Sequence, residues 1–240
     1  MLVSHRAVRG YMPAMVMPFR AQTASELSNL HPGDRITFEL RVRKSGALAR
    51  NITVSSAGLE GAGGELVIPD PADMLSLGAL VPDFVLMDQT GRQLQLSDFR
   101  DRIVAVNFIY TRCPLPEVCP RLAASFAQLQ RRFADRMGRD LVLFSITLDP
   151  QYDTPKVLSE YARKWRADPA AWKFLSGSAA EIEGIARRFG VVYWPEEGLI
   201  THTNSTAIVG RDGRMIARVD GSSFEPQQLG DLVAQNLAAK

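Results

Sequence analysis

The chain lacks the features that would place it across a membrane or on a nucleic acid. Its 240 residues contain no apolar run of the roughly eighteen needed to cross a bilayer, and residues 1–10 lack the apolar core of a signal peptide. The formal charge is only +2, without a cluster of basic residues, so no concentrated basic face for nucleic acid is expected. With 46% hydrophobic and 22% charged residues, the composition is that of an ordinary globular protein.

Cysteine and histidine are scarce. The chain has 2 cysteines and 3 histidines. Two cysteines are too few for a disulfide-stapled scaffold, so their role has to come from their surroundings in the sequence.

The pattern of residues predicts two domains joined by a linker. Residues 1–55 are interpreted as a small all-β unit, because apolar and polar residues alternate from 35 to 43 as in a half-buried strand. Residues 56–78 are rich in Ser, Ala, Gly and Pro, which is typical of a flexible joint. Residues 79–240 alternate strands with longer helical segments, which predicts an α/β domain.

The expected elements of this second domain follow from periodicity. Two almost continuously apolar segments, 103–110 and 141–148, predict central strands that are covered on both faces. Apolar residues recur every three or four positions from Leu122 to Met137, which predicts an amphipathic helix. Further strands are expected at 84–87, 94–96, 206–209 and 215–219, and further helices at 155–165, 179–189 and 226–238.

The two cysteines lie on one proline-stiffened loop between a buried strand and a helix. Pro114 and Pro116 fall between Cys113 and Cys119. Backbone N–H groups and the positive end of a helix favour the thiolate, which attacks disulfides and binds soft metals. The alternative is a pair of inert thiols or a static disulfide that pins the loop, and the spacing alone does not remove it.

A third ligand has to come from elsewhere in the chain, since two sulfurs do not complete a trigonal metal site. His202 is the candidate, in an expected loop at 199–204 just before the closing hairpin. A loop histidine taken alone is more often solvated than bound to a metal. Two thiolates and one imidazole suit copper, whereas a tetrahedral zinc site needs a fourth ligand.

Residues 81–237 resemble the Sco/SenC family. The resemblance is carried by a Pro-Asp-Phe opening, Asn-Phe-Ile-Tyr-Thr-Arg-Cys-Pro, Val-Cys-Pro, Asp-Pro-Gln-Tyr-Asp-Thr-Pro and the histidine before the hairpin. It implies a thioredoxin-like fold with a central mixed sheet flanked by helices. It also implies copper bound by Cys113, Cys119 and His202, an acidic residue near the metal at Asp149, and delivery of copper to a cytochrome c oxidase subunit.

Two positions depart from the common family pattern. Five residues separate the cysteines here, where three are usual, and Thr201 stands where the family often has an acidic residue before the histidine. The longer loop shifts the expected balance toward redox exchange, and Thr201 leaves open how His202 is oriented.

The segment around residues 11–19 resembles CusF-like copper-binding domains, which are small OB-type β-barrels. In that family, a Met-x-Met pair and an upstream histidine bind Cu(I), and the matching positions are Met15, Met17 and His5, with Met12 as a possible further thioether. The alternative is that the methionines fill an irregular core. The barrel lacks its expected first strand, so an export signal and a membrane anchor are expected upstream of this chain.

Two functions compete for the same thiols. The first is a periplasmic copper chaperone that is not an enzyme. The second is a thiol–disulfide oxidoreductase that uses Cys113 and Cys119 as its redox pair, with a peroxidase activated by Arg112 as a weaker third option. His202 distinguishes the first two, because copper binding needs it and dithiol exchange does not.

Overall fold

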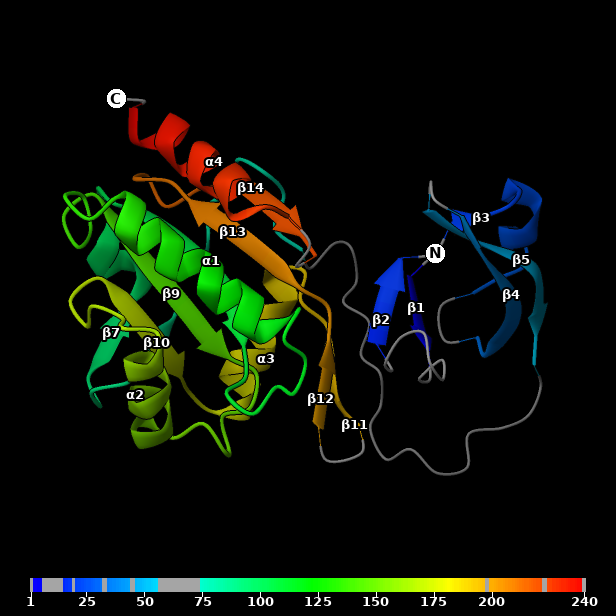
Figure 1. The fold of residues 1–240 in the computed structure, drawn as a ribbon, viewed down its shortest axis with the longest axis horizontal. Coiled ribbons are helices and arrows are strands. Elements are labelled where there is room, and N and C mark those ends of the chain that lie inside the picture. The colour runs from blue at the N-terminus through cyan, green and yellow to red at the C-terminus, as the bar shows by residue number, and fades with distance from the viewer. Residues whose placement is uncertain are drawn as a thin grey trace. The chain divides into compact units, whose positions relative to one another are not determined.

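The computed structural model describes residues 2–5, 15–18, 20–31, 34–43, 46–55, 74–196, 199–221 and 224–238. The chain divides into two compact units (Figure 1). The small unit comprises Met1–Ile68 and Tyr193–Thr203, and the large unit comprises Pro69–Val192 and Asn204–Lys240. The sequence did not predict that residues 193–203 group with the amino-terminal unit. Residues 56–73, most of the expected linker, lie outside the described residues.

The large unit is built on a seven-stranded mixed sheet of order β14-β13-β8-β9-β10-β6-β7. β8, β9 and β10 run parallel at its centre, and the outer strands pair antiparallel. The strands are β6 (Val85–Asp88), β7 (Gln93–Gln95), β8 (Ile103–Ile109), β9 (Leu141–Thr147), β10 (Trp172–Ser176), β13 (Ser205–Val209) and β14 (Met215–Asp220). Every residue of β8 and β9 is buried, as their continuous apolar sequence predicts.

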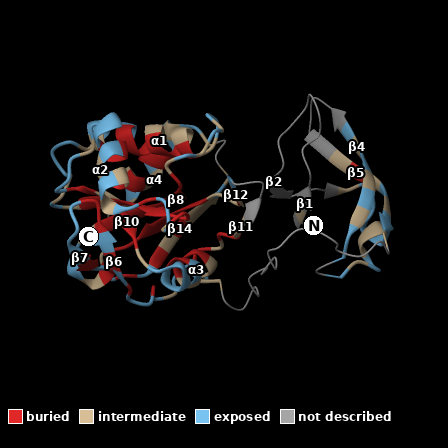
Figure 2. Cartoon of the chain, turned by 90° about the horizontal axis from the view of Figure 1, so that it is seen from below, coloured by how far each residue is buried: buried red, intermediate tan, exposed pale blue. Residues whose placement is uncertain are grey.

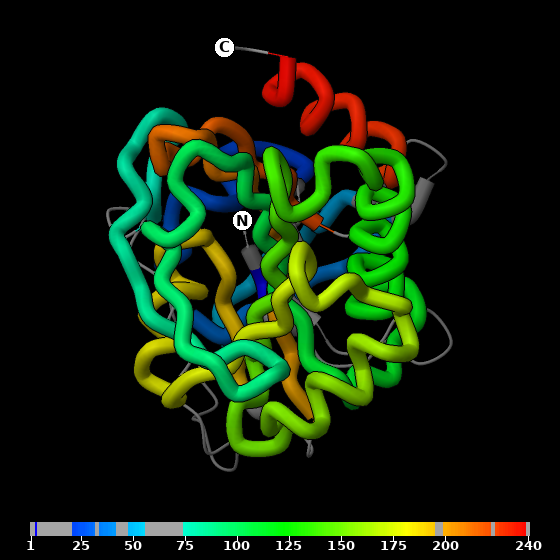
Figure 3. The backbone as a smooth tube through the Cα atoms, turned by 90° about the vertical axis from the view of Figure 1, so that its left-hand side faces the viewer, coloured from blue at the N-terminus to red at the C-terminus, as the bar shows by residue number. Residues whose placement is uncertain are grey.

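Four helices flank the sheet, namely α1 (Cys119–Arg132), α2 (Pro155–Lys164), α3 (Ala179–Arg188) and α4 (Pro226–Ala238). α1 and α4 pack against each other over β8, and α3 lies on the opposite face of the sheet (Figures 2 and 3). A short 3-10 helix, η3 (Leu96–Phe99), precedes β8. This arrangement confirms the predicted α/β class with a mixed sheet between helices.

α1 is shorter than the sequence predicts. It begins with Pro120 in its first turn, where a missing N–H costs nothing. It ends at Arg132 because Phe133, with φ −115° and ψ 32°, leaves the helical conformation. Met137 instead forms a β-bridge with Leu141, so the apolar period beyond Arg132 continues into a turn that packs on the core.

The core of the large unit is aromatic. Trp172 is fully buried, stacks on Phe174 with 5.0 Å between ring centroids, and donates its indole N–H to the hydroxyl of Ser145 at 3.0 Å. Phe126 of α1 meets Trp172 edge-on. These contacts fix α1 on the sheet, and with it the cysteine at the start of that helix.

The described residues of the small unit form short strands and one 3-10 helix. Its elements are β1 (Leu2–His5), β2 (Met15–Pro18), β3 (Arg20–Ala21), η1 (Ala24–Leu27), β4 (Ile36–Arg43), β5 (Gly46–Val54), β11 (Tyr193–Glu196) and β12 (Leu199–His202). β1 pairs with β2, β11 with β12, and β3, β5 and β4 form a three-stranded sheet. β12 also lies beside β2. The OB-type barrel stays a prediction.

The hairpin of β11 and β12 corrects one local interpretation. Residues 199–202 form a strand that pairs antiparallel with β11, with His202 opposite Tyr193, where the sequence analysis expected a loop. In the described part of the chain, none of the helices combines the length and apolar character that a membrane span requires.

Candidate functional site

The structure brings the two cysteines together where β8 leads into α1. Cys113 follows β8 in a turn, where its N–H donates to the carbonyl of Tyr110 at 3.3 Å, and Cys119 is the first residue of α1. Both are thiols rather than a disulfide, and their side chains hydrogen-bond to each other. Cys119 is fully buried and Cys113 is partly exposed. An incoming ion or disulfide therefore reaches Cys113 first.

Burial changes the chemistry expected of Cys119. Burial, and then the contact with Cys113, raise the pKa of the Cys119 thiol well above its ordinary value, although a backbone hydrogen bond from Tyr110 opposes this. The sequence analysis expected a helix start to favour the thiolate. For Cys119 desolvation outweighs that effect, so the side chain carries a proton at neutral pH and must lose it to bind a metal.

A buried carboxylate, which the sequence analysis did not select, supports the loop before Cys113. Asp153 is 0% exposed and accepts a hydrogen bond from the N–H of Thr111 at 3.1 Å, another from the Thr111 hydroxyl, and one from the Thr147 hydroxyl at 2.5 Å. Burial raises the pKa of Asp153, and the hydrogen bonds from Thr111 and Thr147 oppose that rise. The next residue, Thr154, caps α2 by accepting from the N–H of Val157, so Asp153 is not the capping residue.

An ion pair lies beside the thiol loop. The Arg112 guanidinium donates to Asp149 at 2.6 Å and lies over the Tyr152 ring, 4.9 Å from its centroid. The hydrogen bond to Asp149 raises the pKa of Arg112 further above its ordinary value. Asp149 is thus held by Arg112, and Arg112 is engaged with a carboxylate, which weakens the peroxidase interpretation.

The third predicted ligand is a buried side chain of the small unit. His202 ends β12, and its Nδ1 lies 2.9 Å from the carbonyl oxygen of Thr203. Because a carbonyl only accepts, Nδ1 is the donor in this contact, which fixes the orientation of the ring. Among the described residues, no group of three or more His, Cys, Asp or Glu side chains has a metal-binding arrangement. Of the three predicted ligands, the structure therefore brings together the two thiols of the large unit, Cys113 and Cys119.

His202 precedes the first residue of β13 by three positions. β13 begins at Ser205 and runs antiparallel to β8, with Thr206 opposite Asn107. The start of β13 therefore lies at the end of the sheet where β8 leads to Cys113.

Comparison with known proteins identifies the family. Residues 72–237 match the family model described as SCO1/SenC. The chain belongs to the SCO1/SenC family. The SCO1 protein homolog of Bacillus subtilis is 30% identical over 150 residues, which cover 61% of this chain and 76% of that protein. The chain spans only 48% to 66% of the length of the other curated relatives it matches.

Solved Sco structures confirm the thioredoxin-like fold. A structure of BsSco, described as a member of the Sco family of cytochrome c oxidase assembly proteins with a disulfide switch, is 26% identical with a TM-score of 0.58, over 70% of this chain and 99% of that one. Bradyrhizobium japonicum ScoI with copper bound is 25% identical with a TM-score of 0.54, over 66% of this chain and 99% of that one.

The amino-terminal part of this Sco/SenC protein has a second match. Residues 1–54 match the model described as copper binding periplasmic protein CusF. In the pairing of β1 with β2, His5 stands opposite Met15, and Met17 lies two positions along the same strand. Positions two apart lie on one face of a strand, so the backbone register puts all three on one face of the pair. Met12 lies outside the described residues.

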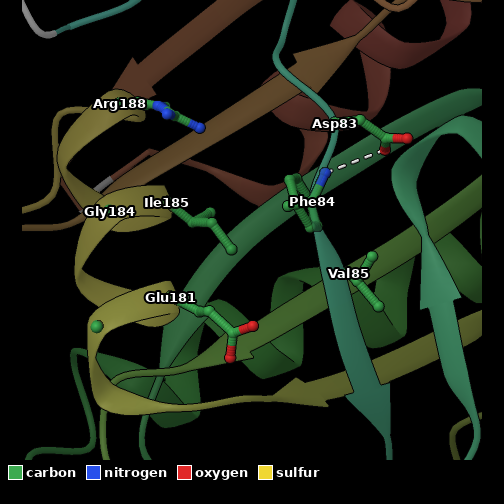
Figure 4. A pocket seen from close by; sticks show the side chains of 8 residues that line it. Asp83, Phe84, Val85, Glu181, Gly184, Ile185 and Arg188 are labelled. Atoms are coloured by element: carbon green, nitrogen blue, oxygen red, sulfur yellow. Dashed lines mark hydrogen bonds between the residues drawn. The ribbon is translucent and has the colours of Figure 1, made fainter.

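One pocket lies away from the thiols. It has a volume of about 430 Å³ and lies between the start of β6 and α3 (Figure 4). Phe84 and Ile185 form its apolar floor, and Asp83, Glu181 and Arg188 line it with charge. Hydrogen bonds from Ser97 and Ser178 lower the pKa of Asp83 and Glu181, respectively. Neither cysteine nor histidine contributes to it, so it is separate from the thiol site.

Proposed function

We propose that this protein is a periplasmic copper chaperone of the Sco/SenC type that holds copper through Cys113, Cys119 and His202. The observation that carries the proposal is the pair of reduced, contacting thiols at the start of α1 on a Sco fold. Sulfur ligands with one imidazole suit copper in either oxidation state. The copper-bound Bradyrhizobium japonicum ScoI and the periplasmic CusF match support copper and the compartment. We propose a cytochrome c oxidase subunit as the recipient, in line with the description of BsSco.

The hydrogen bond of His202 supports its role as third ligand. The Thr203 carbonyl accepts from Nδ1 and orients the ring, and metal-binding histidines are commonly held through their other nitrogen in this way. The short connection from His202 to Ser205 supports the same role, since β13 begins near the end of β8.

Replacing His202 with alanine separates the chaperone from the competing oxidoreductase. His202→Ala should weaken Cu(I) binding at the thiols by at least about tenfold, because the imidazole is lost while both of the softer thiolate ligands remain. The rate of dithiol exchange with glutathione disulfide should change by less than about twofold. Cu(I) affinity is measured by competition with a colorimetric chelator, and exchange by quenched thiol labelling.

His31→Ala is the matched control, because His31 is an 81% exposed histidine of the small unit. Its Cu(I) affinity should equal that of the wild type. Unchanged copper affinity in His202→Ala would remove His202 from the site and leave the oxidoreductase as the better function.

We also propose that His5, Met15 and Met17 form a second Cu(I) site that passes its ion to the thiols. The backbone register, the CusF match and the position of β12 beside β2 support this. Thioethers are soft ligands that select Cu(I).

The second site predicts a change in stoichiometry. Wild-type protein should bind two Cu(I) ions, and the double variant Met15→Ala with Met17→Ala should bind one, as measured by copper analysis after gel filtration under reducing conditions. Met87→Ala is the control, since Met87 is an exposed methionine of the large unit. One copper per chain in both the wild type and the double variant contradicts a second site.

A further inference from the structure

The carboxylate of Asp153 is an unusual neighbour for a copper site, because it is a fully buried acid held only by neutral donors. It is 0% exposed and accepts from the Thr111 N–H, the Thr111 hydroxyl and the Thr147 hydroxyl. Among the described residues, no Lys, Arg or His forms an ion pair with it; the neighbouring Arg112 pairs with Asp149 instead. The electrostatic field of a buried carboxylate without a paired cation is weakly screened, because the protein interior has a low dielectric constant.

This field reaches the thiols. Thr111, which donates twice to Asp153, stands two positions before Cys113, so the carboxylate lies behind the cysteine loop. Asp153 also interacts electrostatically with Cys119, on the other side of the pair. The acid therefore acts on the thiol pair from behind the loop, through the Thr111 hydrogen bonds and through its charge, and not as a ligand.

We propose that Asp153 sets the oxidation-state preference of copper at the thiol pair, favouring Cu(II) over Cu(I). The inference rests on the proposed copper site at Cys113 and Cys119. Cu(I) with two thiolates carries one net negative charge, whereas Cu(II) with two thiolates is neutral. A nearby buried anion therefore opposes reduction of the bound ion. The reduction adds one electron to Cu(II), taken from the titrating reductant, and makes or breaks no bond of the protein.

The function of such a bias is to let the site accept and hold copper in either state. Two thiolates alone strongly favour the soft Cu(I) ion. A fixed negative charge behind them counteracts that preference without occupying a coordination position. Asp153 is therefore a positioning residue and not a ligand. It acts through its negative charge and through its hydrogen bonds to Thr111 in the cysteine loop.

The test is a redox titration of the full-length protein loaded with one Cu(II) at the thiols, in wild type and in Asp153→Asn. Neutralising the acid should shift the Cu(II)/Cu(I) affinity ratio toward Cu(I) by about tenfold or more, and tenfold corresponds to about 59 mV for one electron. Asp153→Ser, a smaller neutral residue, should shift the ratio in the same direction, which keeps the test decisive if the asparagine variant folds poorly.

Asp88→Asn is the matched control. Asp88 is also buried, at 2% exposed, and also accepts several hydrogen bonds, but it lies on β6, three strands from β8 in the sheet. Its potential should equal the wild-type value. If Asp153→Asn and Asp153→Ser bind one copper at the thiols with the wild-type potential, Asp153 has no tuning role. Failure of the wild type to bind copper through its cysteines instead overturns the proposed function, so the two failures are distinguishable.

Discussion

Cu(I) affinity should fall by at least about a thousandfold when Cys119 is replaced by serine. The substitution exchanges a soft thiolate for a hard hydroxyl, which neither ionises near neutral pH nor favours Cu(I). Structural Zn²⁺ sites bind with about 10 to 16 kcal/mol in total, so on that scale loss of one thiolate ligand is worth about 4 kcal/mol. The measurement is a competition titration with a Cu(I) chelator of known affinity.

The position of Cys119 allows the effect of this substitution to be assigned to loss of a ligand rather than to loss of the fold. Cys119 is fully buried at the first residue of α1, and serine is nearly the same size, so the helix should keep its place on the core. Ser125→Ala is a control in the same helix, because Ser125 is buried and donates to the carbonyl of Arg121 at 3.0 Å, away from the thiols. Its affinity should stay at the wild-type value. Cys119→Ser protein that binds Cu(I) within tenfold of wild type would show that Cys119 is not a ligand.

Local sequence pattern was sufficient for most of the large unit. β8 and β9 are continuous apolar segments, which is the sequence pattern expected of a strand that is buried on both faces. The helices are indicated by the spacing of their apolar residues. Capping residues, such as Ser178 with Glu181 at the start of α3, are a further local signal of this kind. The placement of Cys113 and Cys119 between strand and helix followed directly from these two patterns.

The hairpin that carries His202 was missed for a physical reason. β11 and β12 are four residues each, and β11 contains Pro195, which normally argues against a strand. Short strands of this kind are specified by pairing with each other rather than by their own composition. The histidine was found through its rarity, its position before β13 and the Sco/SenC resemblance.

Asp153 was missed because its role is non-local. Its hydrogen bonds run to Thr111, 42 positions earlier in the chain, and to Thr147 at the end of β9. An acid next to Thr-Pro is typical of a helix start, and nothing in that local pattern indicates a partner on another loop. Only the fold brings the end of β8, the end of β9 and the start of α2 to one place. Burial also keeps the Cys119 thiol protonated, because it raises the pKa of that side chain.

Copper affinity should therefore rise steeply with pH. Burial and the contact with Cys113 raise the pKa of Cys119, so its thiol is protonated at pH 6 to 8 and a bound metal has to displace that proton. Below the thiol pKa, the thiolate fraction grows tenfold per pH unit. Cu(I) affinity should accordingly increase by about tenfold per pH unit from Cys119 alone, or about a hundredfold between pH 6 and 8. Competition titrations at pH 6, 7 and 8, with the chelator calibrated at each pH, measure this slope.

The dependence of Cu(I) affinity on pH distinguishes the two proposed copper sites and shows which side chain releases the proton. Residual binding by Cys119→Ser should lose about one proton from the slope, because serine has no thiol to ionise. The proposed site at Met15 and Met17 releases no proton from its thioethers, so a Cys113→Ser, Cys119→Ser double variant should bind its remaining copper with a shallower slope than the wild type. A wild-type affinity that is level from pH 6 to 8 would mean that Cys119 is already a thiolate in the folded protein, and that the positive end of α1 outweighs the burial of its first side chain.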